Sequence, residues 1–235
     1  MSKREIYAHE LRSMPSEKWP KYLRANSGLP GPRGNLELIQ AMAQTGGRAD
    51  FDALIATGDE YMVCCGVVGL GALLAADAGP GAVAEIEARL RTHASDQRWR
   101  VREAVAMALQ RLGDADPGRL KSLVLEWTSD ADPLVLRAAA AAICEPRLLA
   151  TPSMAAAAIE VCRRATESLA ALPPDSRRHD DVRTLRKGLG YCWSVAVAAD
   201  PGPGLPVFAA LEASPDADVA WIVRENRKKK RLAGL

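Results

Sequence analysis

The sequence has few aromatic residues, few cysteines and almost no net charge, and each shortage excludes a class of protein. Aromatics make up 5% of the 235 residues, and alanine fills many apolar positions, which favours close-packed helices over sheets. The five cysteines are too few and too scattered for a disulfide framework, and the lack of a C-x-x-C pair argues against a zinc or redox motif. A net charge of +2 argues against a uniformly basic, histone-like protein.

Nucleotide-binding loops, histidine clusters and membrane segments are also missing from the sequence. The glycines of 66–71 lie inside an expected helix with no preceding strand, so we interpret them as points of close helix contact. The longest uncharged run, 61–76, spans 16 residues and contains three glycines, which predicts a buried helix rather than a membrane span. The charged N-terminal segment has no apolar signal core, and we expect a reduced, cytoplasmic protein.

Apolar residues recur with the helical period of 3.6, and no alternating strand is found. Two short helices before residue 27 predict an N-terminal helical arm over 1–26. The further helices are expected at 35–43, 51–55, 60–76, 81–92, 98–112, 117–128, 133–144, 153–171, 181–199, 204–213 and 217–230. From residue 60 on, the second members of successive helix pairs begin 35 to 48 residues apart, as in HEAT-type solenoids. We therefore predict an all-α, right-handed superhelix of about five HEAT-like helix pairs, in one domain over 27–235.

Three of the second helices share a local pattern of an aspartate followed by an arginine. The aspartates Asp96, Asp132 and Asp218 are expected to cap their helices by accepting backbone N–H groups. The arginines one turn later are expected to bond the aspartate of an adjacent repeat and so to form a ladder between repeats.

The helix expected over 98–112 places an aromatic and an acidic side chain away from its apolar stripe. Trp99 and Glu103 are four residues apart, hence neighbours on one face, and lie about 160° from Val101 on a helical wheel. Arg98, Arg100 and Arg102 flank this pair. Cations can hold phosphates, and a carboxylate can stabilise a developing sugar cation, so the group is a candidate site. The alternative is that Trp99 packs between repeats while Glu103 pairs with an arginine.

The segments W-R-V-R-E-A-V-A-M-A-L and E-W-T-S-D-A-D-P-L-V-L-R, continuing to Leu149, resemble the central motifs of the HEAT-like DNA alkylation repair proteins of the AlkC and AlkD type. The resemblance covers 96–149. It implies binding of duplex DNA in a basic concave groove and removal of cationic alkylpurines by N-glycosidic cleavage without metal or organic cofactor. Glu103 would then be the catalytic carboxylate and Trp99 an aromatic contact, while Trp127, Arg137 and Arg147 match surrounding motif positions.

The sequence departs from this family motif at three positions. Ala138 stands where a second arginine is expected, Ala142 where a glutamate is expected, and Ala150 where an aromatic residue is expected. Loss of an acidic and a basic groove residue together is the pattern expected of a relative that no longer cleaves DNA.

Two further segments are rich in cations, and the second also contains aromatic residues. The run Arg227, Lys228, Lys229, Lys230 and Arg231 can follow a phosphate backbone, or it can be a solvated cap on the last repeat. Arg186 and Lys187 precede the aromatic residues Tyr191 and Trp193. We expect both aromatic side chains in the core of an extensively buried helix.

The sequence is compatible with two functions. One is binding of duplex DNA, with possible glycosylase action by Glu103 beside Trp99. The other is a non-catalytic scaffold that binds a protein or nucleic acid on the same concave face. The candidate nucleic-acid contacts are Arg98, Arg100, Arg102, Arg137, Arg147, Arg186, Lys187, Arg227, Lys228, Lys229, Lys230 and Arg231.

Overall fold

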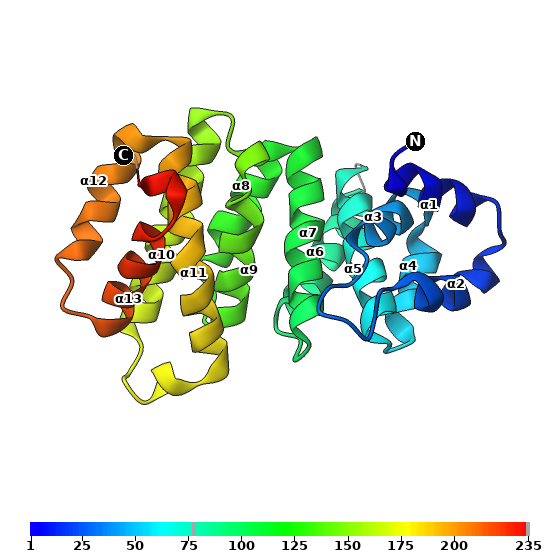
Figure 1. The fold of residues 1–235 in the computed structure, drawn as a ribbon, viewed down its shortest axis with the longest axis horizontal. Helices are drawn as coiled ribbons and strands as arrows, with labels where there is room; N and C mark the ends of the chain where they lie inside the picture. Colours follow the sequence, from blue (N-terminus) through cyan, green and yellow to red (C-terminus); the bar gives the residue numbers. More distant parts are fainter. Residues whose placement is uncertain (77–78, 234–235) are drawn as a thin grey trace. The chain divides into compact units, whose positions relative to one another are not determined.

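The computed structural model describes residues 1–76 and 79–233 and contains only helices and loops in those ranges (Figure 1). Thirteen α-helices and four short 3₁₀ segments are present there, with no strand. The predicted all-α class is confirmed. The chain divides into two compact units, residues 1–112 and 113–235, which are described separately.

The first unit is built around one helix that is apolar on all sides. Its elements are α1 (Lys3–Arg12), η1 (Ser16–Lys18), α2 (Trp19–Asn26), α3 (Leu36–Thr45), α4 (Arg48–Ala56), α5 (Glu60–Ala75), α6 (Pro80–Ala94) and most of α7 (Trp99–Ala115). Helix α5 contacts α2, α3, α4 and α6, and most of its residues are buried. A helix without a polar face is stable in a globular protein only when other helices cover it. No described helix in the chain is long and apolar enough to cross a membrane.

Glycine is needed where α5 meets its neighbours. A Cβ atom on Gly71 would lie 2.3 Å from the carbonyl oxygen of Ala108 in α7, and one on Gly69 would lie 2.3 Å from the ring of Phe51 in α4. The interpretation of these glycines as close-contact positions is confirmed.

The expected N-terminal arm belongs to the core of this unit. Helix α1 packs on α3, and α2 packs on α5. Trp19 is 7% exposed and donates its Nε1–H to the carbonyl oxygen of Leu11, which ties the two helices of the arm together.

The second unit is made of consecutive helix pairs. Its α-helices are α8 (Pro117–Trp127), α9 (Pro133–Ile143), α10 (Pro152–Ala171), α11 (Asp180–Ala199), α12 (Pro201–Glu212) and α13 (Ala217–Arg227), with η2 (Pro146–Leu148), η3 (Ser176–Arg178) and η4 (Lys230–Leu232). The second helix of each pair packs on its equivalents, since α11 contacts both α9 and α13. The first helices α8, α10 and α12 form the other layer. The predicted helix-pair repeat is confirmed here, whereas a single domain over 27–235 stays a prediction.

The turns before the second helices follow the expected capping pattern with one correction. Asp132 caps α9 by accepting the N–H of Leu134 at 2.8 Å, and Asp96 accepts the N–H of Arg98 at 2.8 Å just ahead of α7. The assignment of Asp218 as a cap is wrong. Asp216 caps α13 by accepting the N–H groups of Asp218 and Val219 at 2.9 and 3.1 Å, because the helix begins two residues earlier than an Asp218 cap requires.

The Asp218 carboxylate takes part in the contact between repeats instead. It pairs with Arg186 of α11, and Arg177 of η3 pairs with both Asp216 and Asp218. Arg177 and Arg186 therefore join the last two helix pairs of this unit, whereas the ladder expected from the arginines one turn after the aspartates stays a prediction.

Candidate nucleic-acid-binding surfaces

Trp99 and Glu103 lie on the side of α7 away from its core stripe, as predicted. The stripe is fully or almost fully buried and comprises Val101, Ala104, Val105, Ala108, Leu109 and Leu112. Trp99 is 49% exposed, and the guanidinium of Arg100 lies 4.6 Å from the centre of its ring. Glu103 is half-buried and makes contacts of its own. Trp99 therefore lies outside the core of the first unit, and the alternative of a residue packed between repeats stays a prediction.

The arginines around this pair are directed at protein oxygens. Arg98 forms a two-pronged ion pair with Asp96, through Nε at 2.9 Å and Nη2 at 2.7 Å, and donates Nη1 to the carbonyl of Gly58 at 2.8 Å. Hydrogen bonds from Arg98 lower the pKa of Asp96, although partial burial opposes the shift. Both groups therefore stay charged in the folded protein.

Arg100 and Arg102 are held in a similar way. Arg100 donates to Glu60 at 3.1 Å and to the carbonyl of Gly31 at 2.8 Å, and Arg102 donates to the carbonyls of Asp96 and Gln97. These contacts fix the turns before α5 and α7. Each of the three arginines thus has a structural role, and the phosphate contacts expected of them stay predictions.

The other positions matched by the family resemblance lie in the second unit. Trp127 is 4% exposed, and Arg147 pairs with Asp114 at 2.9 Å and Glu145 at 3.1 Å. Arg137 of α9 lies against α11, where its Cγ would be 3.2 Å from a Cβ on Gly188. Ala138 and Ala142, which replace a charged residue of the motif, are both fully buried.

Helix α11 carries one aromatic residue in the core and one on the surface. Trp193 is fully buried and donates Nε1–H to Thr166 at 2.9 Å, so its predicted core position is confirmed. The core position predicted for Tyr191 is wrong, because its ring is on the face opposite Trp193 and Tyr191 is 46% exposed. The signal in the sequence was the four-residue spacing of Arg183, Lys187 and Tyr191, all of which are exposed.

The C-terminal basic run folds back onto Tyr191. Helix α13 ends at Arg227, three residues earlier than expected, and η4 contacts α11 with Leu232 buried. Arg231 lies 4.9 Å from the centre of the Tyr191 ring and donates Nη2–H to its hydroxyl at 2.9 Å. Lys229 lies 5.7 Å from the same ring. We call Lys187, Tyr191, Lys229 and Arg231 the Tyr191 patch.

The rest of the run is divided between ion pairs and solvent. Arg227 binds Glu212 at 2.7 Å, and Lys228 binds Glu225 at 2.6 Å, so these two cations are neutralised locally. Lys230 is exposed. The run is therefore an ordered cap on the last helix pair that leaves part of its positive charge on the surface.

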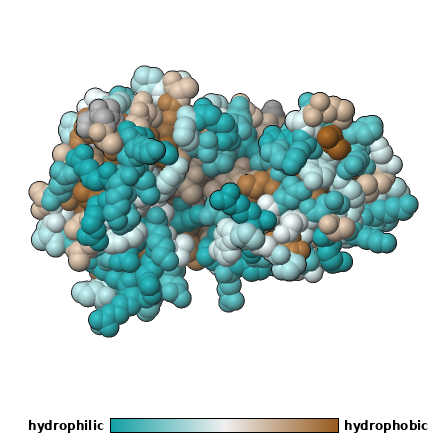
Figure 2. Space-filling view, viewed as in Figure 1, coloured by the Kyte–Doolittle hydropathy of each residue, from teal (hydrophilic) through white to brown (hydrophobic). Residues whose placement is uncertain are grey.

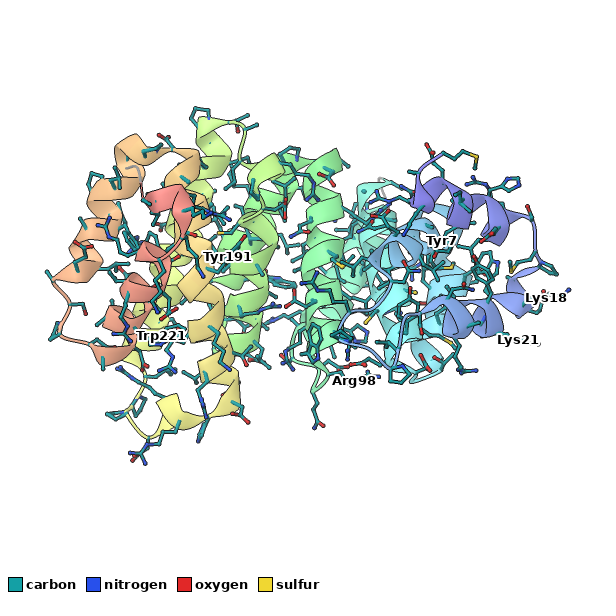
Figure 3. All side chains as sticks on the ribbon, in the orientation of Figure 1. Tyr7, Lys18, Lys21, Arg98, Tyr191 and Trp221 are labelled. Carbon is teal, nitrogen blue, oxygen red and sulfur yellow. The ribbon has the colours of Figure 1, made fainter. Side chains whose placement is uncertain are left out.

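A second aromatic residue lies beside the Tyr191 patch. Trp221 of α13 packs against Gly190, where a Cβ would lie 2.8 Å from its ring. The guanidinium of Arg186 lies 4.8 Å from the centre of the Trp221 ring and is held there by Asp218. Figure 3 shows Tyr191 and Trp221 on the neighbouring helices α11 and α13, and hydrophilic side chains cover much of the visible face of this unit (Figure 2).

Comparisons with known proteins add little beyond this geometry. No family model and no curated protein matches the chain. Among solved structures, the chain is similar to an engineered protein at 14% identity and a TM-score of 0.40, with 100% of both chains covered. It is also similar to a designed armadillo repeat protein in complex with the peptide (KR)4, at 16% identity and a TM-score of 0.38, covering 98% of this chain and 100% of the other. At these values neither match identifies a family or a partner.

Proposed function

We propose that this chain is a non-catalytic helical-repeat protein that binds nucleic acid through α11 and the segment that follows α13. The observation that carries the proposal is the Tyr191 patch, in which Lys229 and Arg231 lie beside an exposed aromatic ring and the exposed Lys187 lies one helical turn before it. Among the described residues, no carboxylate pairs with Lys187, Lys229 or Arg231. The charges of Lys187 and Arg231 are therefore available to a ligand, and Lys229, which lies within electrostatic reach of Glu225, adds to them.

The chemistry of the patch suits a phosphate backbone. Arginine and lysine side chains attract phosphates, and the counterions released on binding make the affinity fall steeply with salt. Aromatic side chains interleaved with cations are a recurrent feature of nucleic-acid surfaces. A protein partner would have to be acidic to satisfy the same cations.

The motif positions around Glu103 support binding rather than cleavage. The alanines that replace an arginine and a glutamate of the family motif are buried, so neither position can present a polar group to DNA. Arg98, Arg100 and Arg102 already serve the turns of the first unit. A non-catalytic function leaves these arginine contacts in place. The glycosylase function would require the arginines to exchange them for contacts with DNA phosphates.

The test is a binding titration of the full chain with fluorescent oligonucleotides, single-stranded and duplex, at several salt concentrations between about 50 and 200 mM. We expect binding that weakens with salt and a shallower salt dependence in the double variant Lys187→Gln, Arg231→Gln. The matched control is Lys18→Gln, Lys21→Gln, which removes two exposed lysines from the first unit. Absence of salt-dependent binding to either oligonucleotide would contradict the proposal and favour a protein partner.

A second candidate function is excision of cationic alkylpurines from duplex DNA, favoured by the exposure of Trp99 four residues from Glu103. In this function Glu103 stabilises the positive charge that develops on the sugar, and Trp99 contacts the damaged nucleotide. The assay is release of 7-methylguanine or 3-methyladenine from methylated duplex DNA by the wild type and by Glu103→Gln. Release by the wild type that is lost in Glu103→Gln would establish this activity, and no release by the wild type would eliminate it.

A further inference from the structure

Resting on the proposed nucleic-acid binding, we infer that the Tyr191 patch selects single-stranded nucleic acid over duplex, with the Tyr191 ring stacking on a base and Lys187, Lys229 and Arg231 holding the adjoining phosphates. The inference concerns the form of the ligand, which the positive charge alone does not specify. It depends on the aromatic part of the patch.

The exposed ring lies among cations from two directions. Lys187 precedes Tyr191 by one turn of α11, and Lys229 and Arg231 come from the segment after α13. In a nucleotide the phosphate is attached to the sugar beside the base. A base stacked on Tyr191 therefore brings its own phosphate and that of the next nucleotide into reach of these side chains.

The aromatic surface continues to the next helix. Trp221 packs against Gly190, the residue before Tyr191, and its ring is backed by the guanidinium of Arg186. Arg186 is anchored by Asp218, so its position does not depend on a ligand. Tyr191 and Trp221 thus lie on adjacent helices, and together they form the start of a stacking platform for successive bases.

A duplex cannot use this platform without losing its own structure. Its base faces are stacked inside the helix, and only phosphates and base edges are accessible, so a ring on the protein gains no stacking unless a base is first extruded. A single strand presents its base faces freely, and stacking on an aromatic side chain strengthens its binding by about 5- to 150-fold. Cations alone would bind the duplex at least as well, because its charge density is higher.

The hydroxyl of Tyr191 accepts a hydrogen bond from Arg231, which is a structural role that does not involve stacking. The two roles are separated by two substitutions. Tyr191→Phe keeps the ring and removes the hydroxyl, whereas Tyr191→Leu removes the ring. Base stacking requires the ring only.

The experiment measures fluorescence anisotropy of the full chain with an oligonucleotide of about 12 nucleotides and with a duplex of the same sequence. We expect the wild type to bind the single strand more tightly than the duplex. Tyr191→Leu should weaken single-strand binding about tenfold and leave duplex binding nearly unchanged, while Tyr191→Phe should stay close to the wild type. Lys187→Gln is the matched control and should weaken both ligands by similar factors.

Two results would overturn the inference while leaving the proposed function intact. One is wild-type binding of the duplex that equals or exceeds that of the single strand. The other is an equal loss of both ligands in Tyr191→Leu. Binding of neither ligand by the wild type would instead remove the proposed function, and with it this inference.

Discussion

The buried amide of Asn226 on α13 joins that helix to α11 by hydrogen bonds in both directions. Its Oδ1 accepts the backbone N–H of Ser194 at 2.8 Å, and its Nδ2 donates to the carbonyl of Leu189 at 2.9 Å. Asn226 is fully buried, so no water competes for these groups. This contact sets the distance between the two helices that carry Tyr191 and Trp221.

We predict that Asn226→Leu destabilises the second unit by about 2–3 kcal/mol, because the N–H of Ser194 loses its partner in a buried place. Urea denaturation followed by circular dichroism measures the change. Ala220→Ser on the exposed side of the same helix is the control and should change the free energy of unfolding by less than about 0.5 kcal/mol. Equal stability of the wild type and Asn226→Leu would show that the amide is not needed for packing.

The Arg177–Asp216 pair predicts a loss of stability in acid. Burial raises the pKa of Asp216, but the guanidinium of Arg177 and the N–H groups of Val219 and Asp218 outweigh it and hold the pKa below its ordinary value. The stability from this lowered pKa is complete above the unfolded value of about 3.9 and is lost as the pH falls toward the folded value. Denaturation midpoints should therefore be flat from about pH 7 to 5 and fall below about pH 4.

The variant Asp216→Asn isolates the charge, because asparagine caps a helix about as well as aspartate. We expect it to lose about 1–2 kcal/mol at pH 7, since both side chains of the pair are largely shielded from water. Its stability should also fall less below pH 4 than that of the wild type. The same acid-induced loss in both proteins would assign the pH dependence to other carboxylates.

The close approach of α5 and α7 predicts an unusual response to glycine replacement. Alanine normally stabilises a helix interior by about 1 kcal/mol over glycine, but in Gly71→Ala the new Cβ would lie 2.3 Å from the backbone oxygen of Ala108. We expect a net loss of about 2 kcal/mol, because neither helix backbone can move without disturbing its other contacts. Thermal denaturation of Gly71→Ala measures it.

Gly81→Ala in α6 is the matched control, because nothing lies within 4 Å of its Cβ position. This substitution should be neutral or stabilising by up to about 1 kcal/mol. A Gly71→Ala protein as stable as Gly81→Ala would contradict the packing between α5 and α7.

The cysteines should be unreactive in the folded protein. All five are buried as free thiols, and burial raises the pKa of Cys64 to about 12. Because the thiolate is the reactive form, we expect almost no labelling by a thiol reagent at pH 8 and labelling of all five in denaturant. Rapid labelling of the native protein would indicate that the helices open on the time scale of the assay.

The sequence predicts the helices well because its local signals agree with the packing. Apolar periodicity and prolines at the first helical position place α8, α9 and α10 within one residue at both ends. The outward position of Trp99 follows from the helical wheel alone. These features depend on residues close together in the chain.

The partners of the charged side chains could not be predicted in the same way. The contact of Arg98 with Gly58 and that of Arg100 with Gly31 join residues 40 and 69 positions apart. Likewise, the contacts of Lys229 and Arg231 with Tyr191 depend on the chain reversing after Arg227, which nothing in the basic run specifies. Charge and helical period therefore identify candidate residues but not the surface on which they meet.

The burial of Leu232 has a consequence for the energetics of any ligand at the Tyr191 patch. A basic tail usually loses conformational freedom when it binds, and this loss weakens the complex. Here the apolar anchor has already fixed the segment during folding. A ligand therefore meets a rigid, preformed array of charge. Removal of the Leu232 side chain should lower the affinity for the ligand, even though every lysine and arginine remains.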